Sequence, residues 1–188
     1  YGRRWGEVIA LGAGSGVGKT DVFTTMIEHD VVTLGLSVGV LYLEQDVVET
    51  VKRIAGKHAG RRFHIPDGGW TRAELSAAIE KVAAEDRLHL FDAFGATDWS
   101  VVKSMIRFMA VSLRCKVISL DHLTALAAAE DDERKALEKI MAELAGMAKE
   151  LSIVLHFVSH LATPEGKPHE EGGRVMAKHF KGSRAIIY

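Results

Sequence analysis

Cysteine is almost absent from this chain of 188 residues, and no long apolar run interrupts it. Because Cys115 is the only cysteine, an intrachain disulfide and a zinc site made of cysteines are both excluded. So little cysteine is typical of a protein from a reducing, intracellular compartment. No stretch approaches the ~20 apolar residues of a membrane span, and the N-terminus lacks a signal-peptide profile. We therefore expect a cytoplasmic protein without a membrane partner.

An excess of charge of either sign is also lacking. The chain has 24 lysines and arginines against 25 aspartates and glutamates, which gives a net charge of −1. This balance excludes a strongly basic nucleic-acid binder, although a local basic loop on a neutral body is compatible with it. The apolar fraction of 47% and the charged fraction of 26% are ordinary for a globular protein.

The length of the chain fits one domain, residues 1–188, with a full hydrophobic core. Both ends of the sequence read as cut. The chain opens only a few residues before its first predicted strand, and it stops inside an apolar segment at 185–188. We therefore expect this domain to be the central part of a longer protein.

Strand and helix patterns alternate along the chain. Short apolar runs predict five strands, at 8–11, 38–43, 88–91, 116–121 and 153–159. Apolar residues at helical spacing predict helices at 19–34, after the caps Asp46, Thr71 and Asp98, and from Asp131 or Asp132 to Leu151, with a loop over 57–70. This alternation predicts an α/β fold, a mostly parallel sheet with helices on both faces. In such sheets, ligands bind at the carboxyl ends of the strands.

A glycine-rich stretch lies between the first predicted strand and the first helix. It fits the pattern G-x-x-x-x-G-K-[ST] except for alanine at its first position, and it consists of Ala13, Gly14, Ser15, Gly16, Val17, Gly18, Lys19 and Thr20. The glycines let backbone N–H groups line an anion site. Lys19 can reach the β- and γ-phosphates, and Thr20 can offer its hydroxyl to Mg²⁺. The order strand, loop, Lys-Thr and helix favours nucleoside triphosphate binding over a merely connecting turn.

Two acids that end predicted strands are candidates for the chemistry. Asp121 has the setting of a carboxylate that holds Mg²⁺ opposite Thr20, and the alternative is a cap or turn aspartate. Glu44 is placed to orient and deprotonate an attacking water, and the alternative is an exposed acid at a strand end. Asp46 competes for that role but also fits a helix cap. For Asp92, a third strand-end acid, we favour a structural role.

Two histidines also follow predicted strands. The imidazole of His160 can hydrogen-bond the γ-phosphate and report hydrolysis to the following loop, or it can simply be a satisfied strand-end side chain. For His122, next to Asp121, a structural role is favoured. The nine histidines show no spacing of a transition-metal site.

The polar segment after His160 contains five cations that could grip a nucleic-acid backbone: Lys167, Arg174, Lys178, Lys181 and Arg184. Three glutamates oppose them, at 165, 170 and 171. The alternative is a solvated loop, because the stretch 163–173 is too rich in Gly, Pro and Glu to belong to a core.

Several of these motifs together resemble a known family. The relevant stretches are 13–20, Leu-Glu-Gln-Asp at 43–46, Ile-Ser-Leu-Asp-His at 118–122, Phe-Val-Ser-His-Leu at 157–161, His-Glu-Glu-Gly at 169–172 and Lys-Gly-Ser-Arg-Ala-Ile at 181–186. In order and spacing the chain resembles the RecA-type motor domain of ring-shaped replicative DNA helicases. The phage helicase–primase and Twinkle branch is nearer to it than bacterial DnaB.

The resemblance implies a RecA-like P-loop NTPase core with Mg²⁺ as cofactor and ATP or another NTP as substrate. It assigns phosphate and Mg²⁺ binding to Lys19 and Thr20, the Walker-B carboxylate to Asp121, the catalytic base to Glu44 and the γ-phosphate sensor to His160. The stretch 161–183 would be a DNA-binding loop, although Lys181 stands where the family commonly has arginine.

The same resemblance implies partners. Such motors are homo-oligomers, usually hexameric rings that hydrolyse NTP between subunits, translocate on single-stranded DNA and work with a fused or associated primase. A phage-encoded member would lie in the cytoplasm of the host cell. An arginine from a neighbouring subunit would complete the site.

Two other functions remain open. A recombinase-type ATPase of the RecA and KaiC kind shares the core, although the Asp121-His122 pair and the stretch 160–172 favour the helicase. An NTP-switched replication scaffold or loader without productive turnover is the second, and intact Lys19, Thr20 and Glu44 argue against it.

Overall fold

The computed structural model describes residues 2–14, 16–43, 46–92, 98–127, 132–162 and 166–180. Its centre is a five-stranded sheet in the order β1-β5-β4-β2-β3, in which every strand pair is parallel. The strands are β1 Val8–Ala13, β2 Val38–Tyr42, β3 Leu88–Asp92, β4 Val117–Asp121 and β5 Val154–His160. The predicted parallel sheet and all five predicted strands are confirmed.

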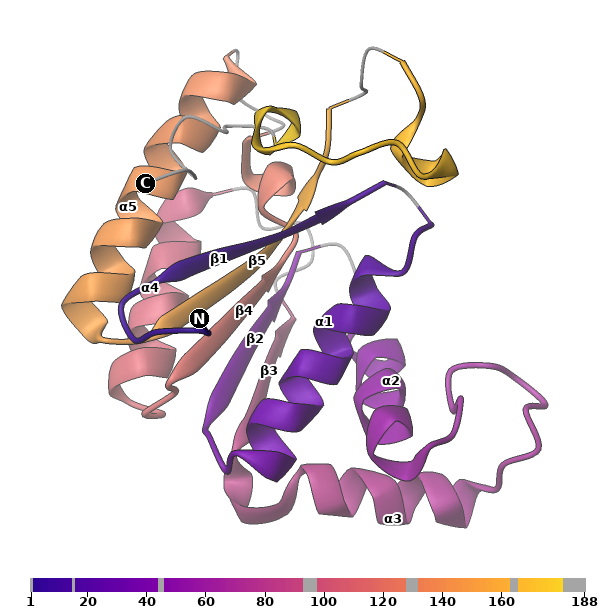
Figure 1. Ribbon diagram of the computed structural model, residues 1–188. Helices are drawn as coiled ribbons and strands as arrows, with labels where there is room; N and C mark the ends of the chain where they lie inside the picture. The colour runs from indigo at the N-terminus through magenta and orange to yellow at the C-terminus, as the bar shows by residue number, and fades with distance from the viewer. Residues whose placement is uncertain are drawn as a thin grey trace.

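Helices cover both faces of the sheet (Figure 1). On one face lie α1 Lys19–Glu28 and α2 Val47–Ala59, with α3 Arg72–Val82 packed against α2; on the other lie α4 Trp99–Val111 and α5 Glu133–Leu151. The strands read as apolar because each of their faces meets helices. On β4, for example, Ile118 and Leu120 belong to the core under α4 and α5, whereas Val117 belongs to the core under α1.

The predicted helix starts are confirmed by their caps. The carboxylate of Asp46 accepts a hydrogen bond from the N–H of Val48 at 2.7 Å, and the carboxylate of Asp98 accepts one from the N–H of Ser100 at 2.7 Å. Thr71 opens α3 in a capping box with Glu74. Asp132 caps α5, whereas Asp131 lies outside the described residues. Each such cap contributes about 1 kcal/mol.

Two helix predictions need correction. The helix predicted over 19–34 is α-helical only to Glu28 and continues as a π-helical turn, His29–Thr33, and Val22, expected on its apolar side, is 51% exposed. The predicted loop at 57–70 begins too early, because α2 runs to Ala59 and ends at Gly60, whose φ is +65°. Glycine adopts the left-handed conformation of a helix C-terminus without strain, so the helix continues up to Gly60 and ends there.

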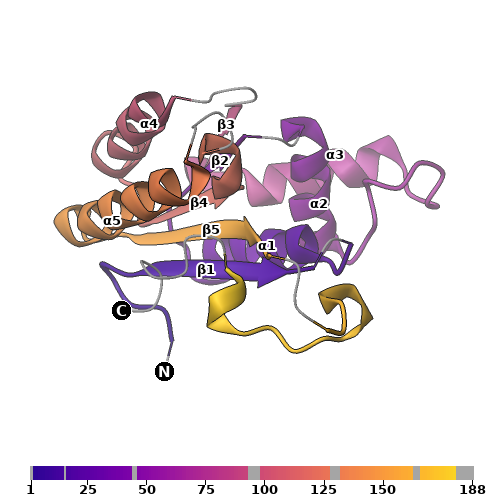
Figure 2. The ribbon, with the colours of Figure 1, turned by 90° about the horizontal axis from the view of Figure 1, so that it is seen from above.

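The segment 166–180 folds back over the carboxyl ends of β1 and β5 (Figures 1 and 2). Leu161 and Phe180 form an antiparallel bridge, and a Cβ on Gly12 would lie 2.6 Å from Cζ of the Phe180 ring. Only a glycine in β1 permits this close approach. We expected the stretch 163–173 to contribute no buried side chain, and this is wrong for His169. Its side chain is 8% exposed, and its ring centroid lies 4.7 Å from that of the buried His179.

Candidate functional site

The glycine-rich loop connects the carboxyl end of β1 to the first turn of α1. Gly16 and Gly18 have φ of +72° and +97°, a backbone region that other residues enter only with strain. Gly18 is the N-cap of α1, so the unpaired N–H groups and the positive end of the helix dipole face the loop. Ser15 lies outside the described residues. The loop thus has the backbone of an anion site.

Lys19 lies in the mouth of this loop. Its Nζ donates hydrogen bonds to the carbonyl oxygens of Ala13 at 2.9 Å and Gly14 at 2.7 Å. Partial burial lowers the pKa of Lys19, and the negative charges of Asp121 and Glu170 oppose that shift. The ammonium group therefore lies between the loop and the acid at the end of β4, although Lys19 and Asp121 are far apart in the sequence.

A cavity of about 480 Å³ opens at the start of α1. Eight residues line it: Gly16, Gly18, Lys19, Thr20, Asp21, Asp46, Glu49 and Arg53. The loop residues and Lys19 and Thr20 were expected here, and Asp46 lines the cavity besides capping α2. Arg53 was not foreseen. Its only sequence signal is the four-residue spacing from Glu49 on a helix that follows a strand of the site, where the two side chains form an ion pair at 2.6 Å.

Asp121 ends β4 beside the end of β2. It is 4% exposed and lies opposite Tyr42, and its carbonyl accepts a hydrogen bond from the N–H of Leu43 at 2.8 Å. Side chains alternate along a strand, so Asp121 and Val117 share the face that α1 covers. Glu44, the predicted base, follows Leu43 directly but lies outside the described residues.

The end of β5 is the neighbour of the glycine-rich loop. The backbone of His160 pairs with Ala13, the first residue of the loop pattern. The side chain of His160 lies outside the described part of the structure. The sheet register thus brings the position expected for a γ-phosphate sensor next to the expected phosphate site.

The oxygen donors of the site suit Mg²⁺ better than a transition metal. Thr20 offers a hydroxyl and Asp121 a carboxylate, and within the described ranges no three His, Cys, Asp or Glu side chains form a metal-binding group. Mg²⁺ keeps most of its water ligands and needs only one or two protein oxygens besides the phosphates. The residues present therefore fit this ion.

Glu170 touches the glycine-rich loop, which the sequence did not indicate. A Cβ on Gly14 would lie 2.6 Å from the Oε1 of Glu170, and the charge of this carboxylate acts on Lys19. Together with Phe180 against Gly12, this contact joins the segment 166–180 to β1 and to the loop that follows it.

Three of the five cations proposed for DNA binding are described. Lys167, Arg174 and Lys178 are exposed along the segment 166–180, whereas Lys181 and Arg184 lie outside the described residues. His122 and Asp92, for which a structural role was expected, also lie within the described residues. Nδ1 of His122 lies 2.9 Å from the hydroxyl of Thr124 in a buried contact, and Asp92 ends β3 opposite Tyr42.

None of the helices within the described ranges combines the length and the apolar character that crossing a membrane requires.

Comparison with known proteins gives matches along most of the chain. Residues 1–171 match the family described as DnaB-like helicase C-terminal domain. A DNA helicase/primase of Enterobacteria phage T3 is 32% identical over 202 aligned positions, which cover 98% of this chain and 34% of the phage protein. The chain thus spans about a third of the length of that relative.

Two solved structures share the fold. A solved ATPase domain superposes with a TM-score of 0.75 at 20% identity, covering 99% of this chain and 66% of the other. A DnaB-like replicative helicase, solved with a view to its interactions with primase, superposes with a TM-score of 0.69 at 21% identity, covering 86% of this chain and 40% of the other. At these identities the likeness shows the fold.

Proposed function

Because the chain belongs to the family of DnaB-like helicase C-terminal domains, we propose that it is the NTP-hydrolysing motor domain of a replicative DNA helicase. Residues 1–188 form one RecA-like domain of a longer protein that translocates on single-stranded DNA and unwinds duplex DNA. One observation carries the proposal: Lys19, in a glycine-rich loop at the start of α1, donates hydrogen bonds to the carbonyls of Ala13 and Gly14, within reach of the charge of Asp121 at the end of β4.

Binding of the nucleotide falls to the loop 13–20. The ammonium group of Lys19 exchanges the carbonyls of Ala13 and Gly14 for the β- and γ-phosphates, which the backbone N–H groups also bind. The hydroxyl of Thr20 and the carboxylate of Asp121 hold Mg²⁺, which when bound neutralises charge on the phosphates.

Hydrolysis needs a base, and its coupling to DNA needs a group that detects the γ-phosphate. Glu44 orients the attacking water and accepts its proton; the hydrogen bond from Leu43 to Asp121 supports this role, because it ties the preceding residue to the site. His160 hydrogen-bonds the γ-phosphate, and the pairing of its backbone with Ala13 supports that assignment.

Single-stranded DNA binds along the segment after β5. Its cations Lys167, Arg174 and Lys178, and beyond the described residues Lys181 and Arg184, contact the DNA backbone. The contacts of Glu170 with Gly14 and of Phe180 with Gly12 couple this segment to the nucleotide, since a change at the loop is transmitted through them.

The longer protein assembles into a ring, a hexamer in which a neighbouring subunit completes each nucleotide site. The phage T3 relative is a helicase/primase, and the DnaB-like helicase structure concerns interactions with primase. We therefore infer a fused or associated primase as partner, and the cytoplasm of a host cell as location.

A strand-displacement assay with the longest native chain tests this function. We expect a forked DNA duplex to be unwound in the presence of Mg²⁺ and NTP. The Lys19→Ala variant should lose unwinding and bind nucleotide roughly 10- to 100-fold more weakly, because it removes a charged hydrogen-bond donor worth about 1.5–3 kcal/mol. Lys81→Ala, at an exposed position of α3, is the matched control. Unwinding that persists in Lys19→Ala would contradict the proposal.

A further inference from the structure

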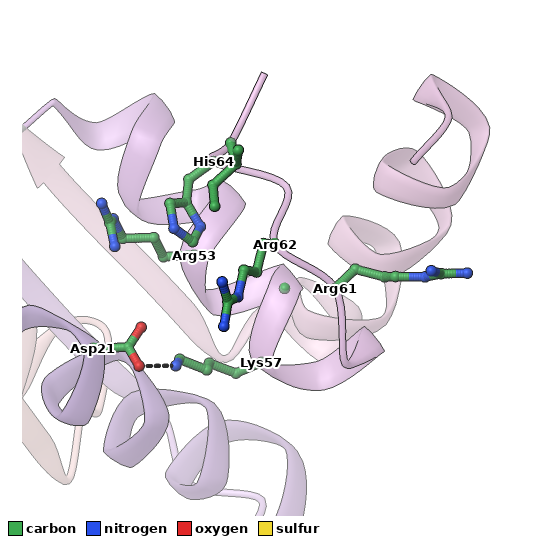
Figure 3. Close-up of a pocket in the computed structure, with 8 residues that line it drawn as sticks. Asp21, Arg53, Lys57, Arg61, Arg62 and His64 are labelled. Atoms are coloured by element: carbon green, nitrogen blue, oxygen red, sulfur yellow. Dashed lines mark ion pairs between the residues drawn. The ribbon is translucent and has the colours of Figure 1, made fainter. Parts of the chain in front are cut away.

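A second cavity adjoins the cavity at the start of α1, which we call the nucleotide pocket, and is lined mainly by charged side chains. Its volume is about 350 Å³, and Arg53, Lys57, Arg61, Arg62, His64 and Asp21 border it. In Figure 3, Arg53, Lys57, Arg62 and His64 lie close together, whereas the guanidinium group of Arg61 extends away from them. Asp21 and Arg53 also line the nucleotide pocket, so the two cavities are neighbours.

Helix α2 contributes two cations, Arg53 and Lys57, to this second cavity, which we call the basic pocket. Arg53 and Lys57 are four residues apart on the helix and therefore project from the same face. Lys57 forms an ion pair with Asp21 of α1 at 2.5 Å, which joins the two helices at the floor of the pocket. Both cations are thus positioned before any ligand arrives.

The turn after α2 contributes Arg62 and His64 to the basic pocket. The N–H of Arg61 donates to the carbonyl of Gly56 at 3.0 Å, which turns the chain back over the helix. Phe63 is 1% exposed and packs edge-on against Trp70, with ring centroids 5.5 Å apart. Because the side chain of Phe63 is packed in place, its two neighbours in sequence, Arg62 and His64, are held beside the pocket.

The charges of the basic pocket are incompletely balanced. Arg53 pairs with Glu49 and Lys57 with Asp21, but among the described residues no acid lies within ion-pair distance of Arg62. Nδ1 of His64 is buried and has no hydrogen-bond partner in the described part of the chain. The pocket therefore holds positive charge and hydrogen-bonding capacity that an anion would satisfy.

The side chains that line the basic pocket indicate which kind of anion it binds. Ile65 is the one aliphatic side chain that lines the pocket among the described residues, whereas sites for bases and other apolar groups are lined mainly by hydrophobic and aromatic side chains. Guanidinium groups match the oxygens of phosphate in geometry and charge. The volume is at the lower limit of ligand pockets, which suits a small hydrated ion.

We propose that this basic pocket is a second anion site, distinct from the phosphate loop, which binds a free phosphoryl anion such as inorganic phosphate or pyrophosphate. The proposal does not depend on hydrolysis at the neighbouring site. If hydrolysis occurs there, the released phosphate is the nearest source of the ligand, since Arg53 borders both cavities.

Calorimetric titration with sodium pyrophosphate tests the proposal in the longest native chain carrying Lys19→Ala, without Mg²⁺ and in a buffer free of phosphate and sulfate. Lys19→Ala disables the phosphate loop, so that the remaining binding reports on the basic pocket. Adding Arg62→Ala should weaken binding at least tenfold. Adding Arg72→Ala removes the same charge from the exposed start of α3, outside the lining of the pocket, and should change the affinity less than twofold. Circular dichroism checks that each variant is folded.

Three results would overturn the site. Pyrophosphate binding that disappears with Lys19→Ala alone would place the anion in the phosphate loop. Equal losses in the Arg72→Ala and Arg62→Ala variants would indicate a general effect of charge. Tighter binding of ADP than of pyrophosphate, abolished by Arg62→Ala, would make the pocket part of a nucleotide site.

Discussion

His156 shows how burial sets the properties of a single residue. It lies on β5, 2% exposed, and neither ring nitrogen has a hydrogen-bond partner among the described residues. Burial lowers its pKa from 6.5 to about 4, the nearby charge of Arg3 acts in the same direction, and that of Asp30 opposes it. The ring is therefore neutral in the folded protein at neutral pH.

This shift predicts a loss of stability in acid. Between pH 6.5 and 4 the unfolded chain binds a proton at His156 that the folded chain does not, so stability falls as the pH falls. From pH 7 to pH 5 this residue should remove about 2 kcal/mol from the free energy of unfolding. Urea denaturation of the wild type and of His156→Leu at both pH values measures the difference. An equal loss of stability in the two proteins would contradict the assignment.

Glu44 is the residue whose proposed role is most specific. Glu44→Gln keeps the size of the side chain but removes the proton acceptor, so we expect NTP binding within about twofold of wild type and hydrolysis lowered ~100-fold or more. Single-turnover NTPase measurements with parallel binding titrations check both values. Asp46→Asn is the matched control, since Asp46 lines the cavity at the start of α1 and caps α2, a role that asparagine also fills. Normal hydrolysis by Glu44→Gln would assign the base to another acid.

Site residues could be predicted from the sequence where the backbone conformation of the loop requires a particular residue type. Gly16 and Gly18 adopt a positive φ, and Lys19 and Thr20 must follow them at the start of a helix, so a local pattern identifies all four. Arg53 has no such pattern. It reaches the nucleotide pocket only because α2 packs beside α1, and that packing is a tertiary contact that spacing along the chain does not encode.

At the level of elements, the contact between β1 and the segment 166–180 depends on the absence of a side chain at Gly12. A methyl group there would lie 2.8 Å from Leu161 and would displace Phe180. We expect Gly12→Ala to destabilise the protein by about 1–3 kcal/mol, as overpacking does, and to increase proteolytic cleavage within 166–180.

Gly146 provides the matched control for this substitution. It lies in α5 with open space where a Cβ would be, so Gly146→Ala should stabilise the helix by about 0.5–1 kcal/mol. Thermal unfolding and limited proteolysis of both variants measure these effects. A Gly12→Ala protein as stable and as protease-resistant as wild type would show that the contact contributes nothing.

Helix starts were more predictable than helix ends. Asp46, Thr71 and Asp98 cap their helices through local hydrogen bonds that the sequence encodes within three residues. The π-helical turn at His29–Thr33 contains Asp30, whose buried carboxylate pairs with Arg3. This partner lies 27 residues away, so the contact that buries Asp30 within the turn has no local signal.

At the scale of the whole molecule, the alternation of strands and helices predicted the class of sheet but not its strand order. In the order β1-β5-β4-β2-β3, β5 and β4 lie between the two strands that come first in the chain. That arrangement brings His160 beside Ala13 and Asp121 beside Tyr42. The site therefore forms from segments far apart in the chain. The rule that ligands bind at strand ends connected these segments beforehand, and the family resemblance gave them roles.

The central claim is that this chain is a DNA-driven NTPase motor, and the rate of NTP hydrolysis with and without single-stranded DNA tests it most directly. In the longest native chain we expect single-stranded DNA to raise the rate at least several-fold, through the contacts of the segment 166–180 with the phosphate loop. His160→Ala should retain basal hydrolysis and lose the stimulation. A wild-type rate that is the same with and without DNA would contradict the account.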